Sequence, residues 1–299
     1  MKTAPFDYVR ADTVAEAVAA LADGQDARIL AGGQSLVPIM ALRLAVPGRL
    51  VDISRSTPLR AWTCDDGALT VGAAVTDRAL ELDPEVRSAH PLLAATLAFI
   101  AHPEIRARGT VCGSLAHADP AAELPALLLA TEGEVRLAGS DGERSVPAGD
   151  FFTGPFTTAL DEGEMVTAAR FPLPAPGSGW VVDEIARRPG DFALAGVVCG
   201  IELDGAARCS WARIALFGVA ATPVRAGGAE RLLEGAALGG PVPDDAVLEA
   251  AAAAAFNGVD VLGDEVHASA GYRRAAGTAL VRRALGSAVR AAGEGRHER

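Results

Sequence analysis

The sequence has few of the residues that would mark a metal centre. Its four cysteines, at positions 64, 112, 199 and 209, form no CxxC pair, and its five histidines form no HxxxH or HExxH pattern. The ligand spacings of iron–sulfur and zinc sites are therefore missing, and we expect no metal ligand in this chain. Cys199 lies in a strand-like apolar run, where a buried cysteine acts as a small hydrophobic residue. If the protein carries out redox chemistry, its redox group is organic.

Long apolar runs and basic tracts are missing as well. The longest alanine-rich run, residues 250–256, is far shorter than the roughly 18–20 apolar residues that span a bilayer. Residues 1–7 lack the apolar stretch of a secretory signal. The formal charge of −11 repels phosphate backbones, and arginine pairs such as Arg187-Arg188 are too scattered to form a basic patch. We therefore expect a soluble, cytoplasmic protein with no transmembrane segment and no nucleic-acid partner.

What the sequence does contain is enough apolar material for a large core. Of its 299 residues, 50 % are hydrophobic and 22 % are charged, which is ordinary for a globular protein of one large or two smaller domains. Strands are predicted at 28–30, 50–53, 68–73, 134–137, 144–146, 165–171, 193–203 and 210–219. Helices are predicted at 13–21, 35–42, 91–101, 120–130, 225–234, 243–256 and 269–290, with one more capped by Thr76.

A cluster of prolines and glycines divides the sequence. Three prolines and two glycines lie within the eight residues 172–179, which makes this the best linker candidate. Beyond it, two long strand-like stretches surround the turn Asp204-Gly205, and helices follow. Strands followed by helices favour a small α+β domain over a parallel α/β one.

Two segments could hold a cofactor, and the first of them lies between a predicted strand and a predicted helix. Residues 30–38 contain Gly32-Gly33, where the backbone can turn tightly and expose its N–H groups, and Ser35 adds a hydroxyl. Together with a helix N-terminus, these groups suit a pyrophosphate. A simple strand-to-helix turn is the alternative. The segment contains neither GxGxxG nor a Walker lysine, so any dinucleotide site must be of another design.

The second segment, residues 100–125, is rich in small residues with polar groups between them. Its side chains Thr110, Ser114, Asp119 and Glu123 could reach ribityl or ribose hydroxyls. The alternative is a plain helix–loop–helix connection in which Asp119 is an ordinary N-cap. Two histidines in the segment, at 102 and 117, are more typical of a turn or a hydrogen-bonded core residue than of a catalyst, because no Ser or Cys arrangement near them indicates a triad.

The two segments resemble a known pair of signatures. Residues 31–36 and 108–123 are similar to the two FAD signatures of the carbon monoxide dehydrogenase medium-subunit family, which includes the flavin part of xanthine dehydrogenase. The resemblance covers nearly the whole chain, and its further matches lie at 42–43, 51–53, 150–152, 188–193 and 221–225.

This resemblance implies an α+β fold. Residues 1–176 would form a two-part FAD-binding domain of the vanillyl-alcohol-oxidase (PCMH) type, with subdomains of about 1–57 and 58–176. Residues 177–290 would form a smaller C-terminal domain with antiparallel strands and helices, and 291–299 a tail. The linker predicted from composition agrees with that division.

The resemblance also implies the site. The first glycine loop and residues 110–114 would hold the pyrophosphate, Glu123 would bind cofactor hydroxyls, apolar side chains would line the cofactor, and Phe192 would lie near the isoalloxazine. The cofactor-binding residues predicted in this way are Leu30, Ala31, Gly32, Gly33, Gln34, Ser35, Leu36, Ile100, His102, Thr110, Val111, Cys112, Gly113, Ser114, Ala118, Asp119, Glu123, Met165, Val166 and Phe192.

One residue departs from the family pattern. The second signature usually reads Thr-Ile-Gly-Gly, and Cys112 replaces its first glycine here. If that position needs a positive φ, or very close approach to a phosphate, the substitution costs about 1 kcal/mol or more.

The resemblance implies a subunit that transfers electrons. A partner with the molybdenum cofactor would oxidise the substrate, and a 2Fe-2S partner would relay electrons to FAD and on to an acceptor such as NAD or a quinone. We assign no catalytic acid, base or nucleophile, because the flavin supplies the chemistry. The alternatives are a stand-alone FAD-dependent oxidoreductase, with His102, His117 or Asp191 as acid or base, and a scaffold that has lost its flavin.

Overall fold

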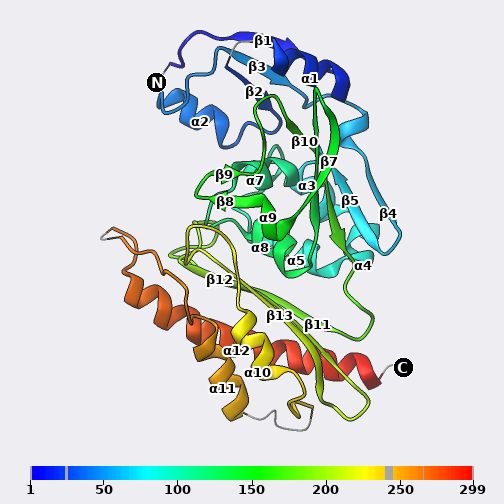
Figure 1. Ribbon diagram of the computed structural model, residues 1–299, viewed down its shortest axis with the longest axis vertical. Coiled ribbons are helices and arrows are strands. Elements are labelled where there is room, and N and C mark those ends of the chain that lie inside the picture. Colours follow the sequence, from blue (N-terminus) through cyan, green and yellow to red (C-terminus); the bar gives the residue numbers. More distant parts are fainter. Residues whose placement is uncertain (1, 24–25, 240–244, 265, 298–299) are drawn as a thin grey trace. The chain divides into compact units, whose positions relative to one another are not determined.

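The computed structural model describes residues 2–23, 26–239, 245–264 and 266–297, and its chain forms two compact units (Figure 1). The first unit comprises Met1–Ala89, Ala101–Ala118 and Glu132–Pro172. The second comprises His90–Ile100, Asp119–Thr131 and Leu173–Arg299. Two helical segments that interrupt the first unit in sequence therefore belong to the second.

A small parallel sheet begins the first unit. Its three strands, in the order β1-β3-β2, are β1 (Asp7–Arg10), β3 (Arg49–Asp52) and β2 (Ala27–Leu30). The connecting helices are α1 (Val14–Ala22) and α2 (Leu36–Ala41). The capping box predicted for α1 is present in a shifted form: Thr13 Oγ1 accepts the N–H of Glu16 at 3.2 Å, while Glu16 accepts the N–H of Asp12 at 2.8 Å.

An antiparallel five-stranded sheet forms the larger part of the first unit. Its order is β4-β5-β10-β6-β7, with the strands β4 (Trp62–Asp65), β5 (Ala68–Gly72), β10 (Met165–Pro172), β6 (Glu134–Gly139) and β7 (Gly142–Pro147). A two-stranded sheet pairs β8 (Phe152–Gly154) with β9 (Thr157–Thr158). The short helices of this unit are η1 (Pro58–Arg60), α3 (Asp77–Leu82), α4 (Pro84–Ala89), α6 (Pro103–Arg106), α7 (Val111–His117) and α9 (Ala148–Phe151), of which α4 ends at the limit of the unit.

The second unit is a four-stranded antiparallel sheet between helices. Its strands, in spatial order, are β11 (Gly179–Ile185), β12 (Ala195–Leu203), β13 (Cys209–Phe217) and β14 (Val224–Arg225). One face packs against α10 (Gly227–Leu233), α11 (Asp245–Ala254) and the long α12 (Ala270–His297), which runs along the sheet in Figure 1. Contacts with the same sheet are also made by α5 (Pro91–Phe99) and α8 (Glu123–Ala130).

The alternation of side chains explains why β12 and β13 read as long apolar runs. Val197, Cys199 and Ile201 belong to the core shared with α10–α12. On the other face, an added side chain at Gly200 would meet the ring of Trp180 at 2.6 Å, so the glycine leaves room for the indole. A strand buried on both faces has no polar alternation.

Most predicted elements are confirmed. The strands β1 and β4 and several short helices were not predicted, and α12 continues to His297, past the predicted end at 290 and into the predicted tail. Strand β11 begins at Gly179, the last residue of the segment that composition marked as a linker, and was not predicted. Helix α8 begins at Glu123 rather than at 120, because Asp119 first forms a turn in which its carboxylate accepts the N–H of Ala121 at 2.9 Å. The helix predicted at 243–256 corresponds to α11, and residues 243–244 lie outside the described residues.

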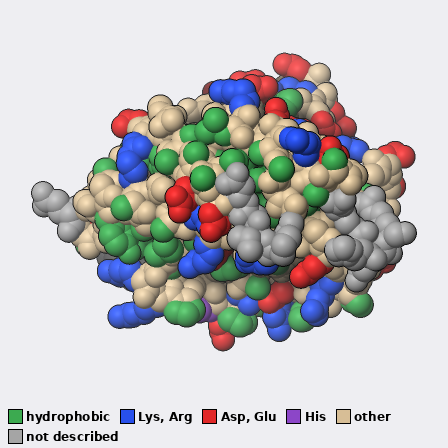
Figure 2. All heavy atoms as spheres, turned by 90° about the horizontal axis from the view of Figure 1, so that it is seen from below, with side chains coloured by type: hydrophobic (Ala, Val, Ile, Leu, Met, Phe, Trp, Pro, Cys, Tyr) green, Lys and Arg blue, Asp and Glu red, His purple; other side chains and the backbone are tan. Residues whose placement is uncertain are grey.

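The charged surface is mixed. On the face drawn in Figure 2, Lys and Arg side chains are interspersed with acidic and apolar ones. None of the helices in the described part of the chain combines the length and apolarity that crossing a bilayer requires.

We expect Glu230→Gln to destabilise the second unit by about 3 kcal/mol, because it removes one partner of a buried ion pair. Glu230 Oε1 accepts the backbone N–H of Ile214 at 2.7 Å and Nε of Arg225 at 2.8 Å, and its Oε2 accepts Nη2 at 2.9 Å. Denaturant unfolding measures the loss. The exposed Glu249→Gln is the control, and equal effects of the two substitutions would contradict the prediction.

Candidate cofactor site

The first glycine loop joins β2 to α2 and presents unpaired donors. Gly33 has φ +73°, which glycine adopts without strain. In the part of the chain that the structure describes, the backbone N–H groups of residues 32–35 have no protein acceptor. Ser35 occupies the N-cap position of α2 but makes no capping bond, so its hydroxyl is free to contact a ligand. These half-buried donors suit an anion, since a buried N–H needs an acceptor.

The second glycine segment forms the turn from α6 into α7. Thr110 is the N-cap of α7, and its Oγ1 accepts the N–H of Gly113 at 3.0 Å. Because a hydroxyl both donates and accepts, the Thr110 proton can still be donated to another acceptor. Sequence reasoning predicted the residues here but not the helix that positions them.

The two loops touch at Gly32. A Cβ added at Gly32 would lie 2.1 Å from the carbonyl oxygen of Arg108 and 2.9 Å from Cα of Gly109. Both neighbours are backbone, which cannot move aside cheaply, so only glycine fits. The contact brings two segments that are distant in sequence side by side within the first unit. Their N–H groups and hydroxyls are thereby available to one ligand.

A buried carboxyl supports the second loop, and sequence reasoning missed it. The N–H of Asp77 donates to the Gly109 carbonyl at 2.9 Å, and a Cβ at Gly109 would lie 2.6 Å from Asp77 Oδ2. Oδ1 is buried and has no hydrogen-bond partner. The nearby Arg106 forms a two-pronged ion pair with Glu81, both distances being 3.0 Å. Burial raises the pKa of Asp77 to about 7, although Arg106 opposes the shift.

Cys112 lies in the first turn of α7 and not in a left-handed conformation. It is absent from the residues with positive φ, so the backbone strain considered for this position does not occur. Its side chain is 2 % exposed, and Sγ lies 3.4 Å from the Val71 carbonyl oxygen. Burial raises the pKa of the thiol to about 12. The residue is therefore an unreactive part of the core beneath the loop.

The remaining predicted residues divide between the two units. In the first unit, the first glycine pair is flanked by Leu30, Ala31, Gln34 and Leu36. Helix α7 and its C-cap contain Val111, Gly113, Ser114 and Ala118. His102 is exposed just before α6, and the buried start of β10 contains Met165 and Val166. In the second, Ile100 and Asp119 are half-buried, Glu123 is buried at the start of α8, and Phe192 is 73 % exposed.

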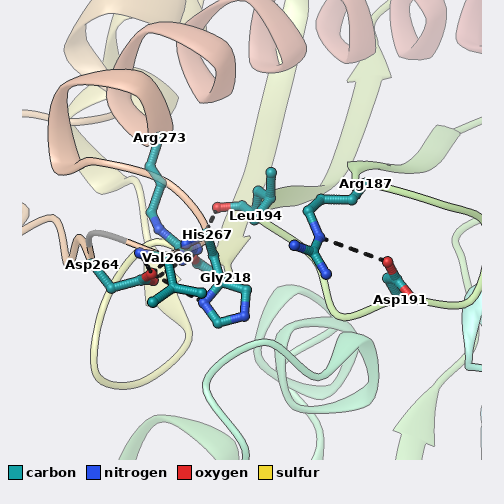
Figure 3. Close-up of polar contacts among 8 residues, drawn as sticks. All are labelled: Arg187, Asp191, Leu194, Gly218, Asp264, Val266, His267 and Arg273. Carbon is teal, nitrogen blue, oxygen red and sulfur yellow. Dashed lines mark hydrogen bonds and ion pairs between the residues drawn. The ribbon is translucent and has the colours of Figure 1, made fainter.

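The three residues weighed as acids or bases each have different surroundings. The ring of His117 contacts that of Phe156, with centroids 5.1 Å apart and planes tilted by 45°. His102 is exposed, and Asp191 lies 3.9 Å from Arg187 (Figure 3). Over the described residues, no three His, Cys, Asp or Glu side chains gather as metal ligands would.

Comparisons with known proteins identify the family. Residues 4–174 match the FAD binding domain in molybdopterin dehydrogenase, and residues 180–288 match the CO dehydrogenase flavoprotein C-terminal domain. This chain therefore belongs to the FAD-binding medium-subunit family of molybdenum hydroxylases, which includes the carbon monoxide dehydrogenase medium chain and the xanthine dehydrogenase FAD-binding subunit. Its cofactor is FAD. The family, the cofactor and the α+β fold predicted from the sequence are confirmed.

Individual relatives are similar over almost their full length. The 6-hydroxypseudooxynicotine dehydrogenase complex subunit alpha of Paenarthrobacter nicotinovorans is 40 % identical over 290 residues, covering 97 % of this chain and 96 % of that one. The carbon monoxide dehydrogenase medium chain of Hydrogenophaga pseudoflava is 39 % identical, covering 95 % and 96 %. The crystal structure of quinoline 2-oxidoreductase from Pseudomonas putida 86 matches with a TM-score of 0.92 at 38 % identity, covering 98 % of this chain and 100 % of that one.

Titration of Asp77 predicts that stability falls as the pH rises from about 4 to about 7. The folded state keeps this proton up to about pH 7, whereas the unfolded chain releases it near the ordinary aspartate pKa of 3.8. Over that window the folded state binds more protons, so the free energy of unfolding declines by up to about 1.4 kcal/mol per pH unit. Asp77→Asn should remove this component from unfolding curves measured at pH 5 and 8. The exposed Asp65→Asn should keep it, and a pH profile unchanged in Asp77→Asn would contradict the prediction.

We expect Cys112→Gly to lower the free energy of unfolding by about 2 kcal/mol, because it removes a buried side chain and places glycine in a helix. FAD affinity, measured by titration, should stay unchanged or improve. Cys112→Ala is the control for the thiol alone. A loss of affinity of tenfold or more in either variant would show that this position has a specific role in binding.

Proposed function

We propose that this chain is the subunit through which electrons pass from the iron–sulfur clusters of a small partner to an acceptor such as NAD or a quinone. A large partner with the molybdenum cofactor would oxidise the substrate. FAD supplies the redox chemistry when it is bound, and the chain supplies its binding, orientation and access.

The observation that carries this proposal is the contact of Gly32 with the backbone of Arg108 and Gly109. It aligns two loops whose N–H groups and hydroxyls suit the two phosphates of a dinucleotide. Backbone donors, Ser35 and Thr110 would hold the pyrophosphate without any lysine. This fit supports a pyrophosphate site of a design other than the Rossmann or P-loop kind.

The other roles follow from the same assignment. Glu123 would accept hydrogen bonds from cofactor hydroxyls, Ile100 and Met165 or Val166 would line the cofactor, and Phe192 would contact the isoalloxazine. The FAD-binding domain would comprise residues 1–176 and the C-terminal domain residues 177–290.

The proposed partners are a molybdenum subunit and a 2Fe-2S subunit. Similar proteins bear names such as caffeine dehydrogenase subunit beta and nicotine 6-hydroxylase medium subunit. Of the four cysteines in this chain, Cys64 is exposed and the other three are buried, one in the first unit and two in the second. A set of cysteines for an iron–sulfur cluster would therefore come from another chain.

The proposal is tested first with the purified chain. Its absorption spectrum should show flavin bands, and chromatography of the released chromophore should identify FAD. Native purification from the host should then recover molybdenum and iron–sulfur subunits with it. A chain that is colourless and takes up no added FAD would overturn the cofactor assignment, and a lone chain that turns over a small substrate would overturn the electron-transfer role.

Gly33→Asp should weaken FAD binding by at least a hundredfold, because a carboxylate would enter the phosphate loop. The isosteric Gly33→Asn is the matched control: it shares the left-handed backbone, φ +73°, and the close neighbours Leu30 and Val37, each 3.2 Å from an added Cβ. Asparagine also tolerates that conformation. Equilibrium titration of FAD should give a much smaller loss for Asn than for Asp. Full flavin content in the Asp variant would disprove the placement of the phosphate at this loop.

A further inference from the structure

The start of helix α3 holds the second glycine segment at two neighbouring points. Thr76, the N-cap of α3, pairs with Thr110 in an isolated antiparallel bridge. The N–H of the next residue, Asp77, donates to the carbonyl of Gly109 at 2.9 Å. All four residues belong to the first unit. The start of α3 therefore fixes the backbone that leads into α7.

The carboxyl of Asp77 extends this contact to the first glycine loop. An added Cβ at Gly109 would lie 2.6 Å from Asp77 Oδ2, and an added Cβ at Gly32 would lie 2.9 Å from Cα of Gly109. The carboxyl, Gly109 and Gly32 thus form a continuous series of close contacts with no other side chain between them. A change of shape or charge at Asp77 therefore acts on the contact between the two loops.

The surroundings of this carboxyl favour its neutral form. Asp77 is 3 % exposed, and within the described residues its Oδ1 has no hydrogen-bond partner. Arg106 favours ionisation but is tied to Glu81 by two bonds of 3.0 Å, and the charge of Glu81, which also accepts Arg78 at 2.8 Å, opposes it. The Cys112 thiol on α7, whose pKa burial raises to about 12, is uncharged. An ionised carboxylate buried without a partner is costly.

Ionisation of Asp77 and binding of a phosphate would oppose each other. In the proposed site the pyrophosphate is held by the donors of residues 32–35 and by Thr110, the residue that follows Gly109. An ionised Asp77 would add a negative charge behind this backbone, in buried surroundings where repulsion between charges is little screened. The neutral carboxyl supports Gly109 without adding that charge.

We propose that Asp77 is a positioning residue whose neutral carboxyl supports the contact of Gly109 with Gly32, and that FAD binding in this chain is linked to the proton that Asp77 carries. The inference rests on the proposed function and deepens it, because it makes cofactor affinity depend on pH. Asp77 acts through Gly109 and is assigned no contact with the cofactor.

The test is an equilibrium titration of the full chain with FAD between about pH 5.5 and 8.5. Because burial raises the pKa of Asp77 to about 7, the wild-type Kd should stay level below about pH 6 and rise roughly tenfold by about pH 8.5. The sign follows from the bound state. A nearby phosphate raises the pKa of the carboxyl further, so the complex holds more protons than the free chain and weakens as the pH rises.

Two substitutions at Asp77 separate its charge from its support of the loop. Asp77→Asn keeps the shape and stays neutral, so its Kd should lie within about threefold of the low-pH wild type and stay level, which makes it the tighter binder at about pH 8.5. Asp77→Ala removes the support, so its Kd should be raised roughly fivefold at every pH. The exposed Asp65→Asn should keep the wild-type profile.

A second position tests the same link if a variant at Asp77 does not fold. Glu81→Gln removes the charge that opposes ionisation of Asp77 and releases Arg106 from its ion pair, so the rise in Kd should begin at a pH lower by about one unit. An onset that stays at the wild-type pH would contradict the inference.

The remaining outcomes separate the inference from the proposed function. A wild-type Kd that is constant over this pH range, or a pH dependence that Asp77→Asn retains in full, would overturn only the inference, because the proton on Asp77 would then not affect binding. A wild type that binds no FAD at any pH would overturn the proposed function, and the inference with it.

Discussion

The close approach of Gly32 to the backbone of Arg108 and Gly109 is the constraint on which the proposed cofactor site depends. It leaves no room for a side chain, and both partners are backbone atoms. The two loops come from different connections of the first unit, one from β2 to α2 and the other from α6 to α7, and this contact brings them side by side. The left-handed Gly33 and the capping residue Thr110 then give each loop its direction. The packing of the rest of the first unit matters to the proposed site because it keeps these two turns together.

A chain of net charge −11 that binds a dinucleotide must bind it without relying on its overall charge. In the proposed site the loops would meet this condition through dipoles: unpaired N–H groups and hydroxyls attract phosphate at short range, while the surface charge acts over a longer distance and is screened by salt. The ionisable groups beneath the second loop also add little net charge to it. Arg106 is committed to Glu81, and burial favours the neutral form of Asp77 at and below about pH 7, so neither presents an uncompensated charge to the loop.

Structural features with a local sequence pattern could be predicted, whereas features that depend on residues distant in the sequence were missed. The glycine pair, the Thr76 and Thr13 caps and the apolar runs of strands β12 and β13 each have a local sequence pattern, and these were predicted. The family resemblance supplied the cofactor. Asp77 was missed because its role depends on Gly109, which lies three further helices along the chain. Strand β11 was missed because prolines and glycines precede it directly. At Cys112, only the structure could show that the backbone is helical and that the side chain points into the core.

The second unit contains two carboxylate–arginine pairs that also bind backbone groups of other segments. Glu230 accepts the Ile214 N–H while pairing with Arg225, and Arg273 donates to two carbonyls while pairing with Asp264. Neither pair needs to add much net stability, since desolvation offsets much of the attraction in a buried ion pair. Their contribution is geometric: a planar guanidinium with fixed donor directions allows few positions for the segments that it joins.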